Sequence, residues 1–79
     1  MMKKIKVLFF GALSEISGRE QQTVEIPGNL GDLVELLNSE NPGLKNARFS
    51  IAVNQEISPV DRELSDGDEV ALLPPFAGG

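Results

Sequence analysis

The sequence predicts a two-layer α+β domain in which a single main helix covers one face of a sheet of four or five strands. Several segments alternate apolar and polar residues with the period of two that half-buried strands show, and one segment has the helical period. The chain has 79 residues, so we expect one domain over residues 1–79, with a flexible tail at 74–79. A helix and a sheet each bury one apolar side, and packing them together satisfies both.

The composition restricts how this domain is stabilised and what it can do. It contains no Cys and no His, so disulfides and the commonest metal ligands are absent, and we predict no metal site. Serine hydroxyls have no imidazole to activate them, so the chain is not expected to catalyse a reaction alone. A net charge of −5 opposes binding to nucleic acid or anionic membranes and favours protein partners with basic patches.

The first predicted strand covers residues 3–10, with Ile5, Val7 and Phe9 on one face. The lysines before Val7 superficially resemble the start of a signal peptide, but the apolar run ends at Ser14 and no cleavage pattern follows. We therefore expect a cytoplasmic protein. No stretch approaches the roughly 20 apolar residues that a membrane span needs.

A connection over residues 11–18, with a helical turn at 13–16, leads to the second predicted strand at 22–26. A Pro-Gly pair ends that strand.

The one substantial helix begins at Leu30, where the spacing of apolar residues changes. Its apolar stripe consists of Leu30, Leu33, Val34 and Leu37. Asn29 is a suitable N-cap, and Asp32 lies near the positive end of the helix dipole. Gly31 costs about 1 kcal/mol relative to Ala in a helix, which we expect tertiary packing to override. The Asn-Pro-Gly sequence at 41–43 ends the helix.

The alternation of period two then returns with Phe49, Ile51 and Val53. A turn at 54–56 precedes a short strand near 57–60, and 61–64 is predicted to be irregular or one helical turn. The Asp-Gly-Asp sequence at 66–68 is a strong turn signal before the last strand at 69–73. The predicted order is β, β, α, β, β, β.

The two faces of this sheet are predicted to have different roles. The face toward the helix would carry Ile5, Val7, Phe9, Phe49, Ile51, Val53, Val70 and Leu72. Alternation then places these residues on the other face: Leu8, Phe10, Ala52, Ala71 and Leu73. An uncovered sheet face is usually polar, and exposed apolar area often marks a docking surface. We therefore predict that Leu8, Phe10 and Leu73 bind a partner, unless a loop or the chain's own tail covers them.

The tail after the last strand is the most informative part of the sequence. It consists of Pro74, Pro75, Phe76, Ala77, Gly78 and Gly79. The prolines end the strand and favour an extended chain, and two terminal glycines make the narrowest peptide end available. Fully extended, the tail reaches roughly 20 Å. We predict that it threads into a partner's active site, with Phe76 either anchoring it there or folding back onto its own sheet.

The terminal carboxylate of Gly79 is the candidate reactive group. It is ionised at neutral pH and resists nucleophiles, so it has to be activated, for example by adenylation with ATP on a partner enzyme. Sulfur can then replace the activated oxygen to give a thiocarboxylate, or a lysine amine can form an isopeptide bond. The residues permit both fates.

Several stretches also match a known family. They are residues 7–10, 13–15, the helix from Leu30, 52–54, 64–71, 73–75 and 78–79. On these residues the chain resembles the ubiquitin-like sulfur carriers, and most closely the small subunits of molybdopterin synthase, over nearly its full length. The resemblance implies a β-grasp fold, in which the first and last strands are parallel neighbours at the centre of the sheet.

The resemblance further implies adenylation and thiocarboxylation at Gly79. The tail would then enter the large subunit of molybdopterin synthase, where sulfur passes to cyclic pyranopterin monophosphate to build the dithiolene. The implied partners are this subunit, an ATP-dependent adenylating enzyme of the E1 type and a sulfur donor, and no cofactor is bound by the chain itself. Phe10 and Leu73 match apolar interface positions of the family, whereas Phe76 is larger than the residue common there.

Three other functions fit a β-grasp chain with a terminal diglycine. A sulfur carrier of the thiamine pathway shares the fold and the chemistry, but such carriers tend to be shorter and usually lack the Phe9-Phe10 connection. A protein modifier would be attached to lysines through Gly79. A noncovalent interaction module would have an inert terminus.

Overall fold

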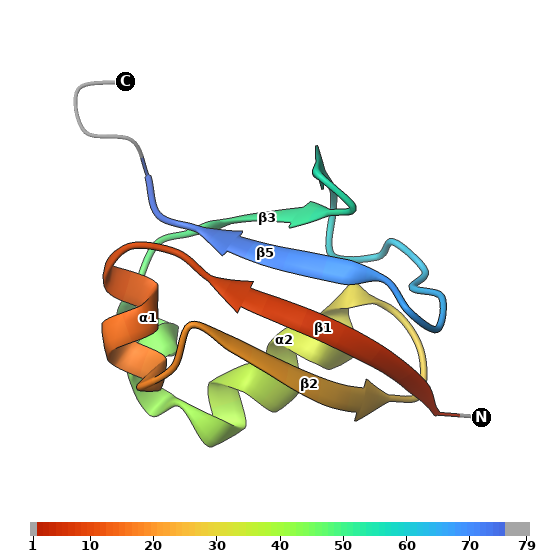
Figure 1. Cartoon of the computed structure of the whole chain (residues 1–79), viewed down its shortest axis with the longest axis horizontal. Helices are drawn as coiled ribbons and strands as arrows, with labels where there is room; N and C mark the ends of the chain where they lie inside the picture. Colours follow the sequence, from red (N-terminus) through yellow and green to blue (C-terminus); the bar gives the residue numbers. More distant parts are fainter. Residues whose placement is uncertain (1, 76–79) are drawn as a thin grey trace.

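The computed structural model describes residues 2–75, which form a five-stranded mixed sheet with one main helix against one face (Figure 1). The strands are β1 (Lys3–Phe9), β2 (Gln21–Ile26), β3 (Ser50–Val53), β4 (Glu56–Ile57) and β5 (Glu69–Leu73). The helices are α1 (Ala12–Ser17), α2 (Leu30–Glu40) and the 3-10 helix η1 (Pro42–Asn46). No helix among the described residues is both long and apolar enough to cross a bilayer.

The strand order in the sheet is β2-β1-β5-β3-β4, so the first and last strands are neighbours. They run parallel, with Val7 opposite Val70 and Phe9 opposite Leu72. The other pairs, β1 with β2, β3 with β5 and β3 with β4, are antiparallel. This arrangement is the β-grasp fold, and the expectation of parallel first and last strands is confirmed.

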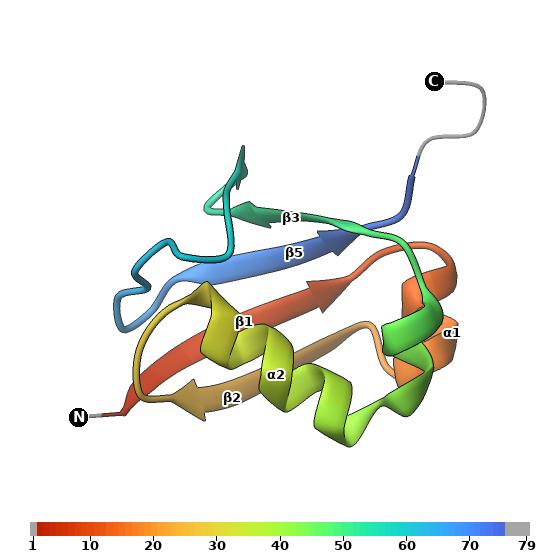
Figure 2. The ribbon, with the colours of Figure 1, turned by 180° about the vertical axis from the view of Figure 1, so that it is seen from behind.

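The core lies between the sheet and α2, which crosses in front of the sheet in Figure 2. It is purely apolar, because no polar or charged residue among those described is buried. The fully buried side chains include Ile5, Val7, Leu30, Leu33, Val53 and Val70. Burying one such side chain contributes about 1.5 to 3 kcal/mol, so this layer replaces the missing disulfides and metal.

The first turn of α2 has every backbone N–H paired. Asn29 is the predicted N-cap and forms a capping box with Asp32, with hydrogen bonds of 3.1 Å to its Oδ1 and 2.9 Å to the Asp32 Oδ2. The N–H groups of Leu30 and Gly31 donate to the carbonyls of Arg62 and Val60, at 2.9 and 2.7 Å. The segment between β4 and β5 therefore acts as a second cap on the helix.

Glycine at position 31 has a structural role that helix propensity does not predict. A Cβ at this position would lie 3.2 Å from the Asn29 Oδ1 and 3.4 Å from the Val60 carbonyl oxygen. Glycine therefore allows the segment around Val60 to approach α2 closely enough to cap it.

Most predicted elements are present with small changes of boundary. β1, β2, α2 and β5 lie where the sequence predicts them, and the turn at 66–68 has Gly67 at φ 90°. The predicted turn at 13–16 is a short helix, α1. The sequence did not predict η1, because Pro42 and Gly43 were interpreted only as the end of α2. Leu44 in η1 is buried, which explains why this segment folds back onto the core.

Two predictions about strand boundaries need correction. β3 begins at Ser50, and Phe49 before it is only half-buried at the edge of the core. The short strand is Glu56–Ile57 instead of 57–60, because Pro59 has no N–H and the Val60 carbonyl bonds to α2. Ala52 lies on the outer face as predicted, and its side chain has only 5% exposure because cross-strand neighbours on both sides enclose a single methyl group.

A polar link ties the β3–β4 turn to the start of β5. The Asn54 Nδ2 donates to the Asp68 Oδ1 at 3.0 Å, and the Asn54 Oδ1 accepts from the Glu69 N–H at 3.0 Å. The Asp68 Oδ2 also accepts from the Ser65 N–H at 2.8 Å. Partial burial acts to raise the pKa of Asp68, but the hydrogen bonds from Ser65 and Asn54, with weaker help from nearby cations, outweigh it and lower the pKa.

The capping box leads to a first prediction. The Asn29→Ala variant should lose about 1 kcal/mol of unfolding free energy, because the Asp32 N–H loses the Asn29 side-chain oxygen that caps it. For a domain of this size, thermal unfolding followed by circular dichroism should show a melting temperature lower by about 4 to 8 °C. The matched control is Ser39→Ala, an exposed site in the last turn of the same helix, and equal melting temperatures for the two variants would contradict the assignment.

The Asp68 link predicts a pH dependence. Since the folded-state pKa lies below the unfolded value of 3.8, the ionised carboxylate stabilises the fold above that value and the stabilisation is lost as pH falls through the folded-state pKa. Asp68→Asn should therefore lower the melting temperature near pH 7, and the difference from the original protein should shrink at about pH 2. Glu35→Gln, an exposed site on α2, should show no such convergence.

Candidate functional site

The outer face of the sheet, the side opposite α2, carries a continuous apolar patch. Strand register builds it in rows: Leu8 lies opposite Ala71, Ala71 opposite Ala52, and Ala52 opposite Ile57. This row crosses four strands, from β1 to β4. A second row lies one step closer to the tail, where the Phe10 N–H donates to the Leu72 carbonyl at 3.2 Å and places Phe10 beside Leu73. We call Leu8, Phe10, Ala52, Ile57, Ala71 and Leu73 the apolar patch.

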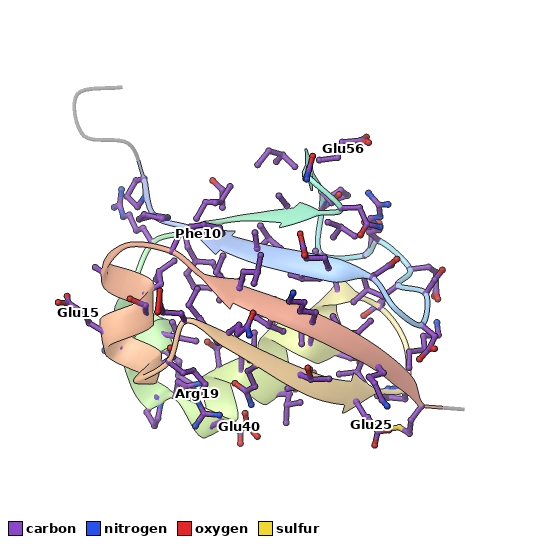
Figure 3. The ribbon with its side chains drawn as sticks, in the orientation of Figure 1. Phe10, Glu15, Arg19, Glu25, Glu40 and Glu56 are labelled. Carbon is purple, nitrogen blue, oxygen red and sulfur yellow. The ribbon has the colours of Figure 1, made fainter. Side chains whose placement is uncertain are left out.

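The predicted docking residues lie together in this patch. Phe10 is 45% exposed, and Leu8 and Leu73 are half-buried. Figure 3 shows Phe10 at the end of the sheet where the chain leaves β5. Figure 1 views the sheet from this side, and α2 lies behind it. Within residues 2–75, the alternative that a loop covers the patch is not supported.

Ile57 belongs to the patch but was not among the predicted docking residues. It is 66% exposed and completes the row on β4. The sequence placed it in a short strand without saying which strand would be its neighbour. The pairing of Ala52 with Ile57 places Ile57 on the outer face. The signal in the sequence that could have predicted this pairing is a hairpin with Asn54 and Gln55 as its two-residue turn.

The part of the outer face that lies away from the apolar patch is polar. Toward β2 and the N-terminal half of β1, it presents Lys4, Lys6, Gln21, Thr23 and Glu25, all exposed. The apolar patch is therefore displaced toward β3 and β4. A partner that buries it would cover β5 and the β3–β4 hairpin more than β2.

The tail begins from a fixed point at the centre of the sheet. Leu73 pairs with Ser50 on one side, and on the other side Phe10 bonds to Leu72. Gly11 follows Phe10 with φ 57°, and a Cβ at Gly11 would lie only 3.0 Å from the Pro74 Cγ. The first proline of the tail therefore packs against the backbone of the β1–α1 connection.

The predicted reactive end lies outside the described residues. Of the predicted threading residues, Pro74 is half-buried and Pro75 exposed, whereas Phe76, Ala77, Gly78 and Gly79 are not part of the description. Residues 2–75 contain no pocket and no group of three or more Asp or Glu placed to hold a metal ion. Residues 2–75 therefore provide an exposed apolar patch, with Pro74, the root of the tail, at its border.

Comparison with known proteins agrees with this geometry. The family model described as the ThiS family matches residues 7–79, a range that includes both the patch and the terminal diglycine. The chain is 42% identical to the molybdopterin synthase sulfur carrier subunit of Mycobacterium tuberculosis, over 99% of this chain and 100% of that protein.

Solved structures give the same result. A Pyrococcus furiosus protein assigned as subunit 1 of a molybdopterin converting factor superposes with a TM-score of 0.88 at 29% identity, covering 94% of this chain and 99% of that one. A subunit in the complex of subunits 1 and 2 of the molybdopterin-converting factor from Helicobacter pylori gives a TM-score of 0.73 at 30% identity, covering 96% and 99%. The chain therefore belongs to the ThiS family, and within it is similar over nearly its whole length to molybdopterin synthase sulfur carrier subunits.

Proposed function

We propose that this protein is the sulfur carrier subunit of a molybdopterin synthase in molybdenum cofactor biosynthesis. The observation that carries the proposal is the match to a molybdopterin synthase sulfur carrier subunit over 99% of this chain and the whole of that protein. The apolar patch and the tail root provide what a carrier needs, a docking surface and a chain end positioned beside it.

The chemistry would take place at Gly79 in three steps. An oxygen of its carboxylate attacks the α-phosphorus of ATP on an adenylating enzyme of the E1 type, and pyrophosphate leaves. A donor of sulfur at the oxidation level of sulfide then attacks the acyl carbon, and AMP leaves with one of the former carboxylate oxygens. In the synthase the thiocarboxylate sulfur attacks a side-chain carbon of cyclic pyranopterin monophosphate, the C–O bond at that carbon breaks and its oxygen leaves. Water then hydrolyses the acyl–sulfur bond, which restores the carboxylate and leaves the sulfur on the pterin.

This division of labour fits the composition of the chain. With no Cys and no His, the carrier has neither of the side chains that most often act as nucleophile or general base near neutral pH. The adenylating enzyme and the large subunit would supply those groups and the substrate pocket. The carrier would supply sulfur on a narrow chain end, at a position set by docking.

The large subunit of molybdopterin synthase is the partner we propose for the apolar patch. The Helicobacter pylori relative is a protein–protein complex of two subunits of the same converting factor. In this chain Phe10 and Leu73 border the point where Pro74 begins the tail, so a subunit seated on them would receive the tail directly. We also propose a cytoplasmic location, because the N-terminal segment is a sheet strand and the chain has no Cys.

Intact mass spectrometry of the protein purified from its own host tests the chemistry. We expect a fraction in which one oxygen is replaced by sulfur at Gly79, and we expect that fraction to vanish when Gly79 is deleted. A chain extended by one bulky residue after Gly79 leaves residues 1–79 unchanged in sequence and should also fail to carry sulfur. Cofactor synthesis supported by the extended chain would refute the proposal.

The same samples separate the alternative functions. Co-purification with a thiazole synthase instead of a pterin synthase subunit would indicate the thiamine pathway. Gly79 joined to lysines of other proteins would indicate a modifier, and normal function without Gly79 would indicate a noncovalent module.

Another prediction concerns the docking residues. Phe10→Ser should weaken binding to the large subunit by roughly 30-fold or more, because truncating a central aromatic contact typically costs about 2 kcal/mol or more. The matched control is Met2→Ser, which removes another exposed apolar side chain at the opposite end of β1. Titration calorimetry should show unchanged affinity for the control, and equal losses for both variants would exclude the patch.

A further inference from the structure

The β3–β4 hairpin holds Gln55 in a strained backbone conformation, although the turn does not require a Gln at that position. The register of Val53 with Glu56 leaves Asn54 and Gln55 as a two-residue turn. Both have positive φ, at 49° and 72°. This is the pattern of a type I′ turn, in which Asn followed by Gly is the preferred sequence. Gln at the second position is unusual, because side chains other than Asn and Asp rarely adopt positive φ.

The two turn residues differ in what their side chains do. The Asn54 amide bonds to Asp68 and to the Glu69 N–H, so its identity is explained by contacts inside the chain. The exposed Gln55 side chain makes no hydrogen bond with any residue of the described range. Backbone strain at a side chain that makes no hydrogen bond within residues 2–75 points to a contact with another molecule.

The position of the hairpin suggests which contact this is. Ile57 follows the turn by two positions, is 66% exposed, and ends the apolar row that begins at Leu8. The opposite end of the same row, on β2, is Gln21, where the face is polar. The apolar patch is thus continuous from the root of the tail to the hairpin and stops short of β2.

We infer that the β3–β4 hairpin is a second contact for the large subunit of molybdopterin synthase, with Ile57 packing on an apolar surface and the Gln55 amide hydrogen-bonding to that subunit. The inference rests on the proposed function and extends its docking surface. Phe10 lies beside the tail root, whereas the hairpin lies at the far edge of the sheet. Two separated contacts fix the orientation of the carrier as well as its position, which a tail aimed at a buried pocket requires.

The test uses the full-length carrier and the isolated large subunit. Gln55→Gly should raise the melting temperature by about 4 to 8 °C, since glycine adopts positive φ without strain, and should weaken binding roughly five- to tenfold. Ile57→Thr keeps a β-branched residue in β4 and should weaken binding at least as much. Gln21→Ala is the matched control, an exposed glutamine at the other end of the same row, and should leave affinity unchanged.

The opposite changes in stability and affinity make the result specific. A Gln55→Gly variant that is more stable and binds as tightly as the original protein would overturn the inference, as would a variant that is less stable. Equal weakening of binding by Gln21→Ala would overturn the inference too, because the effect on affinity would then not be specific to the hairpin end of the row. The original protein's own binding to the large subunit is measured in the same series, so failure of the proposed function is seen separately, as absence of any binding.

Discussion

The parallel pairing of β1 with β5 is the constraint on which the rest of the structure depends. It places Val7 beside Val70 and Phe9 beside Leu72, all buried under α2. Because the two strands are the first and last of the chain, every other element has to fit into the connection between them. The last strand is consequently held on both sides, and the tail starts from the middle of the sheet. Pairing two strands this distant in sequence requires closing the whole connection between them, and the tail has its fixed starting point only when β5 is paired with β1.

The same pairing creates the outer face and leaves it without a helical layer. α2 covers one side of the sheet, and residues 2–75 contain no second long helix for the other. In most small domains that side would be polar. Here it is polar only near β2, and the apolar patch follows β5 and β3 to the hairpin. The segment at 58–63 could have covered the patch, but it crosses to α2 and caps the helix instead.

Local patterns in the sequence were sufficient to predict most helices and strands but not which strands pair with each other. Alternation located β1, β2 and β5, and the Asn29 cap located α2, because these signals depend on neighbouring residues. The strand order came only from the family resemblance, since nothing near Val7 specifies Val70 as its neighbour. Ile57 shows the same limit at the site, because its place in the patch depends on the Ala52 register. The strain at Gln55 is a property of the backbone, which the residue type alone does not disclose.

The cost of delivering a chain end explains why a small domain keeps an apolar patch exposed. Each residue whose backbone becomes fixed in a partner's active site loses conformational entropy worth about 1 to 2 kcal/mol, and a peptide end of glycines offers little surface to offset it. The favourable energy has to come from contacts made elsewhere on the carrier. Phe10, Leu73 and Ile57 provide apolar area that a docked partner would bury, at about 25 cal/mol per Å². Binding energy from a surface that does not react would thus hold the reacting carboxylate in place, and the carrier would have no need of catalytic side chains of its own.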